Sequence, residues 1–328
     1  MWREPPAERW HVEGSDRPKR PTRIGRQNRV EPRSNRSGRG RPGPPLPRPS
    51  TEVRSLLERF GLRPQKGFGQ AFLRDERYFD RIAAAADLTP DDLVVEVGPG
   101  LGGLTRRLAA AAGEVTAVEI DRGLVTALES ILADDPNRAK IKLIGADVLD
   151  LDPAELTGGR PYKLVANLPY YVTSPILRHF LETTEHRPRA LVIMVQREVA
   201  ERMMPRADAM NLLAVMVQYY GKARIVTLVP AQAFYPSPKV DSAVVRIDLH
   251  DRPPLDGDPE KLFRVVHAGF AQPRKQLHNT LSQQLSLPTA TVSDVLRVAG
   301  VDPTRRPQTV SLQEWGAIAR ALAERELV

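Results

Sequence analysis

The tetrapeptide Asn167-Leu168-Pro169-Tyr170 combines residue types that could methylate the exocyclic amine of adenine. That nitrogen is a poor nucleophile, because its lone pair is delocalised into the ring. The Asn167 amide oxygen and a backbone carbonyl of Leu168 or Pro169 could accept hydrogen bonds from the amine and aim its lone pair at a methyl donor. Proline stiffens the loop, and Tyr170 offers a ring face for base stacking. We interpret the loop as an amino-methylation site, with an Asn-x-Pro turn and a packed tyrosine as the alternative.

A glycine-rich segment and two acidic residues could hold a nucleotide-like cofactor. The sequence Glu-Val-Gly-Pro-Gly-Leu-Gly contains Gly98 and Gly100, which allow a backbone to pass close to a ligand. Glu119 follows Gly98 by 21 residues and could accept two hydrogen bonds from a ribose diol. Asp147 could accept one from a cofactor adenine amine, or could be a turn residue. Asp121 suits the N-cap of the next helix.

These features together indicate S-adenosylmethionine as the methyl donor. Its sulfonium is already a strong electrophile, so positioning and electrostatics can supply most of the acceleration. We assign no general base, because no His–carboxylate pair is visible and proton loss can follow methyl transfer. The chain has no cysteine, and its six histidines lack ligand-like spacing such as HExxH, so we expect no metal.

Short apolar runs alternate with helical patterns along the middle of the chain. This predicts an α/β fold with a mostly parallel sheet covered on both faces. The predicted helices are residues 55–60, 73–86, 104–112 and 124–132, and after about Leu255 four more follow at 262–270, 275–285, 290–299 and 312–326. The last two of the predicted strands are expected to form an antiparallel pair at the sheet edge. The strands are residues 93–97, 115–120, 141–144, 163–166, 191–195, 223–228 and 242–249.

The excess positive charge lies at the start of the chain. Residues 1–50 hold 12 Arg, one Lys and five acidic residues, so they account for the whole net charge of +8. Ten of the 30 prolines also lie there, and we expect a disordered tail. The remaining residues carry no net charge, so RNA binding by the folded part needs a local patch. No apolar run approaches the length of a membrane span, so we expect no membrane partner.

From about Arg63 to its C-terminus, the chain resembles the ribosomal RNA adenine dimethyltransferases of the small-subunit branch. The resemblance rests on residues 68–73, 97–105, 167–170, 196–202 and 234–242. It implies a class I S-adenosylmethionine-dependent methyltransferase fold, with a Rossmann-like, mostly parallel sheet, an antiparallel edge and a small α-helical C-terminal domain. We therefore divide the chain into a tail (1–50), a methyltransferase domain (51–253) and a helical RNA-binding domain (254–328).

The resemblance also implies roles for individual residues. The target adenine would be held by the 167–170 loop, with Phe234 as a candidate for its second face. The implied reaction transfers two methyl groups to each of two adjacent adenosines in a hairpin loop near the 3′ end of small-subunit ribosomal RNA, on an assembling 30S subunit. We expect a monomer in the cytoplasm. The implied cofactor contacts are Ala71, Leu73, Gly98, Gly100, Glu119, Asp147 and Asn167.

The chain departs from the family pattern at three places. Ala71 stands where His or Asn is usual, so one polar cofactor contact is missing. Residues 203–211 lack an expected loop that contains Gly and Tyr. Pro273 stands where a basic residue is common, beside Arg274 and Lys275. None of these positions touches the Asn167 loop, so we keep the expected activity.

Three other functions stay open. The erythromycin-resistance branch methylates one adenine of large-subunit RNA on a similar fold, but Leu168, Tyr170 and the run at 98–101 favour the small-subunit branch. A non-catalytic RNA-binding assembly factor predicts broken cofactor residues, and only position 71 is altered. A small-molecule or protein methyltransferase fits poorly with a helical region that carries Arg274, Lys275, Arg305 and Arg306.

Overall fold

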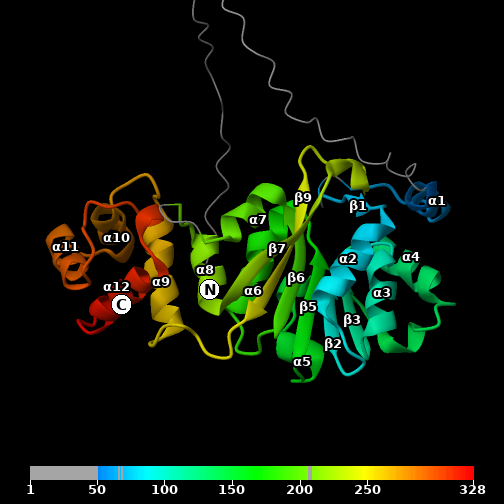
Figure 1. The fold of residues 1–328 in the computed structure, drawn as a ribbon, viewed down its shortest axis with the longest axis horizontal. Helices are drawn as coiled ribbons and strands as arrows, with labels where there is room; N and C mark the ends of the chain where they lie inside the picture. The colour runs from blue at the N-terminus through cyan, green and yellow to red at the C-terminus, as the bar shows by residue number, and fades with distance from the viewer. Residues whose placement is uncertain (1–50, 66, 68, 206–208) are drawn as a thin grey trace, which may run out of the picture. The chain divides into compact units, whose positions relative to one another are not determined.

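A seven-stranded sheet lies at the centre of the protein in the computed structural model (Figure 1). The structure describes residues 51–65, 67, 69–205 and 209–328, all within one compact unit. The predicted disordered tail at residues 1–50 lies outside the described residues. None of the helices in these described ranges is long and apolar enough to cross a membrane.

The strand order of the sheet is β4-β3-β2-β5-β6-β9-β7. The first five of these strands run parallel, whereas β9 is antiparallel to both of its neighbours. This confirms the predicted fold class, a mostly parallel sheet with an antiparallel edge. The strands are β2 (Leu93–Val97), β3 (Glu114–Glu119), β4 (Ile141–Gly145), β5 (Tyr162–Asn167), β6 (Ala190–Gln196), β7 (Gly221–Val229) and β9 (Ser242–Leu249).

Alternate residues of each strand face opposite layers of helices. Val95 of β2 belongs to an apolar core shared with the layer on one face, and its neighbour Val94 belongs to the core shared with the layer on the other. Because both faces are covered at the middle of the sheet, the central strand β2 is buried along its whole length and is apolar apart from Glu96. The Val95 side holds α5 (Pro153–Thr157), α6 (Thr173–Leu181), α7 (Arg197–Met203) and α8 (Leu212–Tyr220), and the Val94 side holds α2 (Glu76–Ala86), α3 (Gly103–Ala111) and α4 (Arg122–Leu132).

The start of the chain's folded part differs from the predicted pattern at one point. Helix α1 (Thr51–Arg59) covers most of the predicted short helix, but α2 begins at Glu76 rather than at Leu73. Phe72 and Leu73 instead form β1, which pairs with β8 (Phe234–Tyr235) in an antiparallel register. A helical apolar pattern could not reveal this pairing, because the partner strand lies far along the chain.

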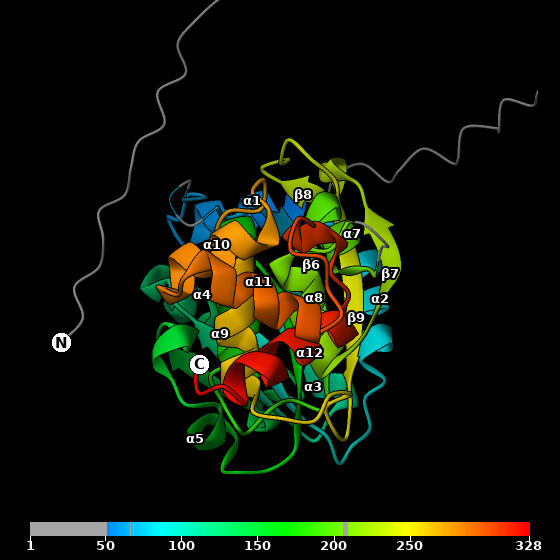
Figure 2. The ribbon, with the colours of Figure 1, turned by 90° about the vertical axis from the view of Figure 1, so that its left-hand side faces the viewer.

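Four helices follow the last strand, as the sequence predicted (Figure 2). Between α9 and α12, Gly269 allows a close approach, because a Cβ there would lie 2.3 Å from the Trp315 ring. The rings of Tyr220 and Phe263 stack with centroids 5.5 Å apart and join α8 to α9. The boundary between residues 253 and 254 stays a prediction. The helices are α9 (Pro259–Phe270), α10 (Leu277–Leu285), α11 (Thr289–Val298) and α12 (Leu312–Ala323).

Candidate cofactor and adenine site

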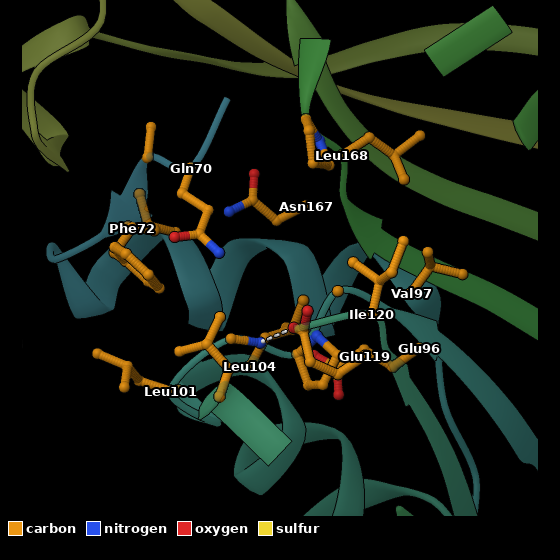
Figure 3. Close-up of a pocket in the computed structure, with 18 of the residues that line it drawn as sticks. Gln70, Phe72, Glu96, Val97, Leu101, Leu104, Glu119, Ile120, Asn167 and Leu168 are labelled. Atoms are coloured by element: carbon orange, nitrogen blue, oxygen red, sulfur yellow. Dashed lines mark hydrogen bonds between the residues drawn. The ribbon is translucent and has the colours of Figure 1, made fainter. Parts of the chain in front are cut away.

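A cleft of about 690 Å³ opens where the parallel strands β2, β3 and β5 end, and its volume is in the usual range for small-ligand sites (Figure 3). Ligands of open α/β sheets bind at this carboxyl edge. Of the residues that the sequence singled out, the cleft lining includes Ala71, Leu73, Gly98, Gly100, Glu119, Asp147, Asn167, Leu168, Pro169 and Phe234.

The glycine-rich turn joins β2 to α3 through left-handed backbone conformations. Gly98 and Gly100 have φ of 70° and 57°, which other residues adopt only with strain. The Gly98 N–H donates to the carbonyl of Val118 at 2.9 Å and ties the turn to β3. Gly102, with φ of 78°, precedes α3, and a Cβ there would lie 2.5 Å from Leu128. The three glycines therefore allow a backbone path that leaves the cleft open.

Glu119 ends β3 with its carboxylate fixed in the cleft. It is 5% exposed, and it accepts hydrogen bonds from the N–H of Gly100 at 3.1 Å and of Asp121 at 3.0 Å. Each contact occupies a different oxygen, so each oxygen keeps a lone pair for a ligand. Burial raises the pKa of Glu119, and the backbone N–H groups of Asp121, Gly100 and Ile120 oppose that shift. The geometry is compatible with two hydrogen bonds from a ribose diol, and this role stays a prediction.

Asp121 is the N-cap of α4, as the sequence predicted. Its Oδ1 accepts hydrogen bonds from the N–H groups of Gly123 at 2.9 Å and Leu124 at 3.3 Å. Its Oδ2 accepts hydrogen bonds from the side-chain amides of Gln65 and Gln70, both at 2.9 Å. Neither glutamine was assigned a role from the sequence. Asp121 thus joins the segment before β1 to the strand end that carries Glu119.

Asp147 lines the cleft and also forms a turn. Its Oδ1 accepts a hydrogen bond from the Leu149 N–H at 3.0 Å and caps the short helix η3 (Val148–Asp150). The turn role, one of the two alternatives, is therefore present. Recognition of a cofactor adenine by Asp147 stays a prediction.

The 167–170 loop continues from β5 along the rim of the cleft. Leu168 is 2% exposed, and its N–H donates to the Met194 carbonyl at 3.2 Å, which anchors the loop to β6. The Pro169 carbonyl accepts a hydrogen bond from the Val172 N–H at 3.2 Å. The Asn167 side chain points into the cleft toward Gln70 (Figure 3). Asn167 and the glycine-rich turn therefore line the same cleft.

The aromatic residues near the loop include one to which the sequence analysis gave no role. The side chain of Tyr170 lies outside what the structure describes. Phe234 lines the cleft but is only 2% exposed and packs with Leu73, so its role as a stacking face stays a prediction. Tyr171, which the sequence reasoning missed, is 56% exposed and lines the cleft. A Cβ on Gly69 would lie 3.4 Å from the Tyr171 ring.

Glu96 is a second residue that the sequence reasoning missed. It belongs to β2, is 1% exposed and lines the cleft. Its Oε2 has no hydrogen-bond partner among the described residues. Burial raises the pKa of Glu96 to about 8. An acid inside an otherwise apolar strand was the available signal, because such a residue is rarely buried without a functional or structural partner.

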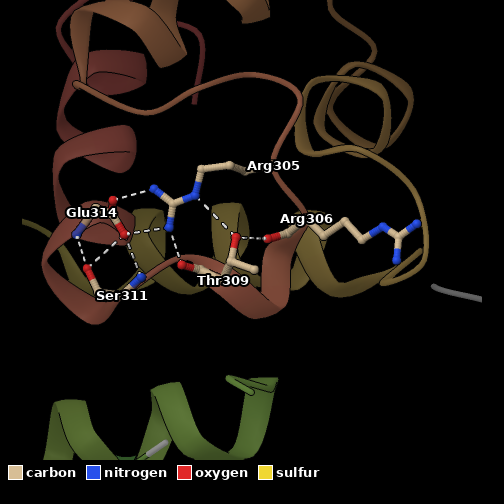
Figure 4. Close-up of polar contacts among 5 residues, drawn as sticks. All are labelled: Arg305, Arg306, Thr309, Ser311 and Glu314. Carbon is tan, nitrogen blue, oxygen red and sulfur yellow. Dashed lines mark hydrogen bonds and ion pairs between the residues drawn. The ribbon is translucent and has the colours of Figure 1, made fainter. Parts of the chain in front are cut away.

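The basic residues of the helical region are not equivalent (Figure 4). The Arg305 guanidinium forms an ion pair with Glu314 at 2.5 Å and donates to the carbonyl of Thr309. Glu314 in turn completes a capping box with Ser311 at the start of α12. Arg305 therefore stabilises the loop before α12, whereas the Arg306 side chain is exposed and points away from this network, and only the Arg306 carbonyl takes part in it. Arg274 and Lys275 are also exposed.

The cleft suits S-adenosylmethionine, a cationic nucleoside. The glycine turn leaves room for a ligand beside the backbone, Glu119 keeps lone pairs for a diol, and Glu96 presents a buried oxygen that lacks a donor among the described residues. No group of three or more His, Cys, Asp or Glu residues that could hold a metal ion was found within the described part of the chain.

Comparisons with known proteins agree with this geometry. A family model described as "Ribosomal RNA adenine dimethylase" matches residues 61–318. The chain is 44% identical over 275 residues to the ribosomal RNA small subunit methyltransferase A of Dehalococcoides mccartyi. The matched residues make up 83% of this chain and 93% of that protein. It is also 43% identical to the protein of the same name from Moorella thermoacetica, over 82% of this chain and 96% of that protein.

A solved structure gives the same result for the fold. The 23S rRNA methyltransferase ErmE superimposes with a TM-score of 0.59 at 31% identity, over 77% of this chain and 99% of that one. The sheet order, the cleft and the matches over most of the sequence lead to one assignment. The chain belongs to the ribosomal RNA adenine dimethylase family, whose members are S-adenosylmethionine-dependent methyltransferases.

Proposed function

We propose that this protein dimethylates the N6 amines of two adjacent adenosines in the 3′-terminal hairpin of small-subunit ribosomal RNA, on an assembling 30S subunit. The observation that carries the proposal is that Asn167 and the turn with Gly98 and Gly100 line one cleft. The names of the relatives from Dehalococcoides mccartyi and Moorella thermoacetica support the small-subunit branch over the erythromycin-resistance branch. We further propose that the protein acts as a monomer in the cytoplasm.

Asn167 and its loop would hold the reacting amine. The Asn167 amide oxygen accepts a hydrogen bond from the adenine amine, and a backbone carbonyl of Leu168 or Pro169 accepts the second. These two contacts draw the nitrogen toward tetrahedral geometry and hold its lone pair toward the cleft. Leu168 keeps the loop in place, because its side chain is buried and its N–H is bonded to β6.

The cofactor would lie along the other residues of the cleft. S-adenosylmethionine supplies an electrophilic methyl group when bound. Gly98 and Gly100 leave space for it beside the backbone, Glu119 binds its ribose, Asp147 binds its adenine, and Leu73 packs against it. The adenosine must leave its stack or come from an unpaired loop to reach Asn167, which fits a hairpin substrate.

RNA docking would use the exposed cations of the helical region, and this predicts different effects for substitutions of two neighbouring arginines. Arg306→Ala should reduce the slope of log affinity against log salt concentration by about 0.7–0.9, because one phosphate contact is lost. Arg305→Met should leave that slope unchanged but reduce the free energy of unfolding by about 1–2 kcal/mol, because Glu314 loses its ion-pair partner. Filter binding across a salt series and urea unfolding measure the two effects. Equal slopes for both variants would contradict the assignment.

Mapping of methylated adenines tests the proposed function. Small and large ribosomal subunits from a strain that lacks this activity are incubated with the protein and S-adenosylmethionine, and both RNAs are then mapped by primer extension and mass spectrometry. We expect dimethyladenosine at two adjacent positions of the small-subunit hairpin. Modification of a single large-subunit adenine would instead support the erythromycin-resistance branch. Binding of subunits without binding of S-adenosylmethionine would support a non-catalytic assembly factor.

A further inference from the structure

Two buried carboxylates face the cleft from neighbouring strands. Glu96 in β2 and Glu119 at the end of β3 both line it (Figure 3). The Glu119 oxygens each accept a backbone hydrogen bond, whereas Oε2 of Glu96 has no partner of good hydrogen-bond geometry among the described residues, and Thr105 is the side chain that favours its anion. A buried ionised oxygen without a donor is costly, so it tends to take up a proton or to bind a ligand.

No cation of the described chain neutralises this pair. None of the ion pairs among the described residues includes Glu96 or Glu119, and no Lys or Arg of that part of the chain is buried. The arginines of α3 that line the cleft bind other acids, Arg106 to Asp135 and Arg107 to Asp80. The other charged groups of the lining are Arg59, Arg74, Glu76, Asp134 and Asp147.

The two carboxyl groups differ in which protonation state they favour. Burial raises the pKa of Glu96 to about 8, the nearby Glu119 adds to the shift, and Thr105 opposes it. The pKa of Glu119 is also raised by burial, but its backbone donors stabilise the anion. Glu96 is therefore the group that holds a proton at neutral pH in the free protein.

We propose that Glu96 releases its proton when the cleft takes up a cationic nucleoside. The carboxylate that forms then makes the cleft bind the sulfonium of S-adenosylmethionine more tightly than the neutral thioether of S-adenosylhomocysteine. The O–H bond of the acid breaks and the proton passes to the buffer. The cleft then holds two carboxylates and one added positive charge on sulfur. After methyl transfer that charge is gone, so Glu96 takes up a proton again and the product is held less tightly. This inference deepens the proposed function and rests on it.

Calorimetric proton counting tests the inference without turnover. Binding of sinefungin, an unreactive analogue with a protonated amine in place of the methylated sulfur, is measured at pH 7 in phosphate and in Tris. Binding of S-adenosylhomocysteine is measured in the same way. Because a carboxyl with a pKa of about 8 is about 0.9 protonated at pH 7, we expect sinefungin to release nearly one proton. S-adenosylhomocysteine should release clearly fewer. Equal proton counts for the two ligands would overturn the inference.

Two Glu→Gln variants test whether the proton released on ligand binding comes from Glu96. Glu96→Gln should abolish the extra proton release and reduce the preference for sinefungin over S-adenosylhomocysteine by about tenfold. The control Glu155→Gln changes an exposed carboxylate of α5 outside the cleft lining and should behave like wild type. Extra proton release that persists in Glu96→Gln would refute the role of Glu96. Failure of wild type to bind either ligand would instead contradict the proposed function, and with it this inference.

Discussion

Asn167→Ala is expected to reduce methyl transfer to under-methylated small subunits by about 10²–10³-fold, because the adenine amine loses the side-chain acceptor that orients its lone pair. The measurement is tritium incorporation from labelled S-adenosylmethionine under saturating cofactor. The loop should otherwise persist, since Leu168 is buried and anchored to β6 through its own backbone. Most of the loss should therefore appear in kcat rather than in cofactor affinity.

Asn137→Ala is the matched control for this experiment. Asn137 is half-buried, precedes the short helix η2 (Arg138–Lys140), makes no side-chain capping bond and lies outside the cleft lining. It should incorporate tritium like wild type. Equal incorporation by Asn167→Ala and wild type would remove Asn167 from the reaction and would overturn the site assignment.

Glu96→Gln should remove a large pH dependence of stability from the ligand-free protein. The pKa of Glu96 is about 8 when folded and about 4.5 when unfolded, so the folded state binds more protons between these values. The free energy of unfolding of wild type should therefore fall as pH rises through this window, by about 3 kcal/mol between pH 5 and pH 8 from this group. Glutamine has no proton to lose, so the variant lacks this contribution.

Urea unfolding at several pH values, followed by circular dichroism, measures this difference. The comparison uses the slope against pH rather than the absolute stability, because glutamine introduces its own amide into the buried site. Glu155→Gln is again the control and should keep the wild-type slope. If Glu96→Gln and wild type depend on pH alike, Glu96 is already ionised in the free protein.

The sheet could be predicted from the sequence because its strands are covered on both faces. The run at residues 93–97 is apolar apart from Glu96, and it coincides with β2. The helices α5 to α8 were not predicted, and for α6 and α8 the physical reason is clear. Pro175 lies in the first turn of α6, where proline is tolerated, but in a sequence it reads as a helix breaker. Helix α8 has seven buried residues out of nine, so it lacks a polar face and a helical period.

The residues of the candidate site could be predicted where their position depends only on the strand that directly precedes or contains them. Gly98 follows β2, Glu119 and Asn167 are the last residues of β3 and β5, and parallel strands end at the same edge. Contacts between distant segments were not predictable. The charges of the sequence did not show that Arg305 forms an ion pair with Glu314. The burial of Phe234 was not predictable either, because it depends on the pairing of β1 with β8. The protonation state of Glu96 likewise depends on how deeply the fold buries its side chain, and the identity of one residue does not reveal that.

The position of β9 between β6 and β7 has a consequence for synthesis of the chain. Within the described sheet, β7 pairs only with β9, which is made later. During translation, residues 221–229 therefore have no strand partner until residues 242–249 have left the ribosome. A nascent chain that stops between these segments exposes an unpaired edge on β6 and a free strand, which are sites for aggregation and chaperone binding.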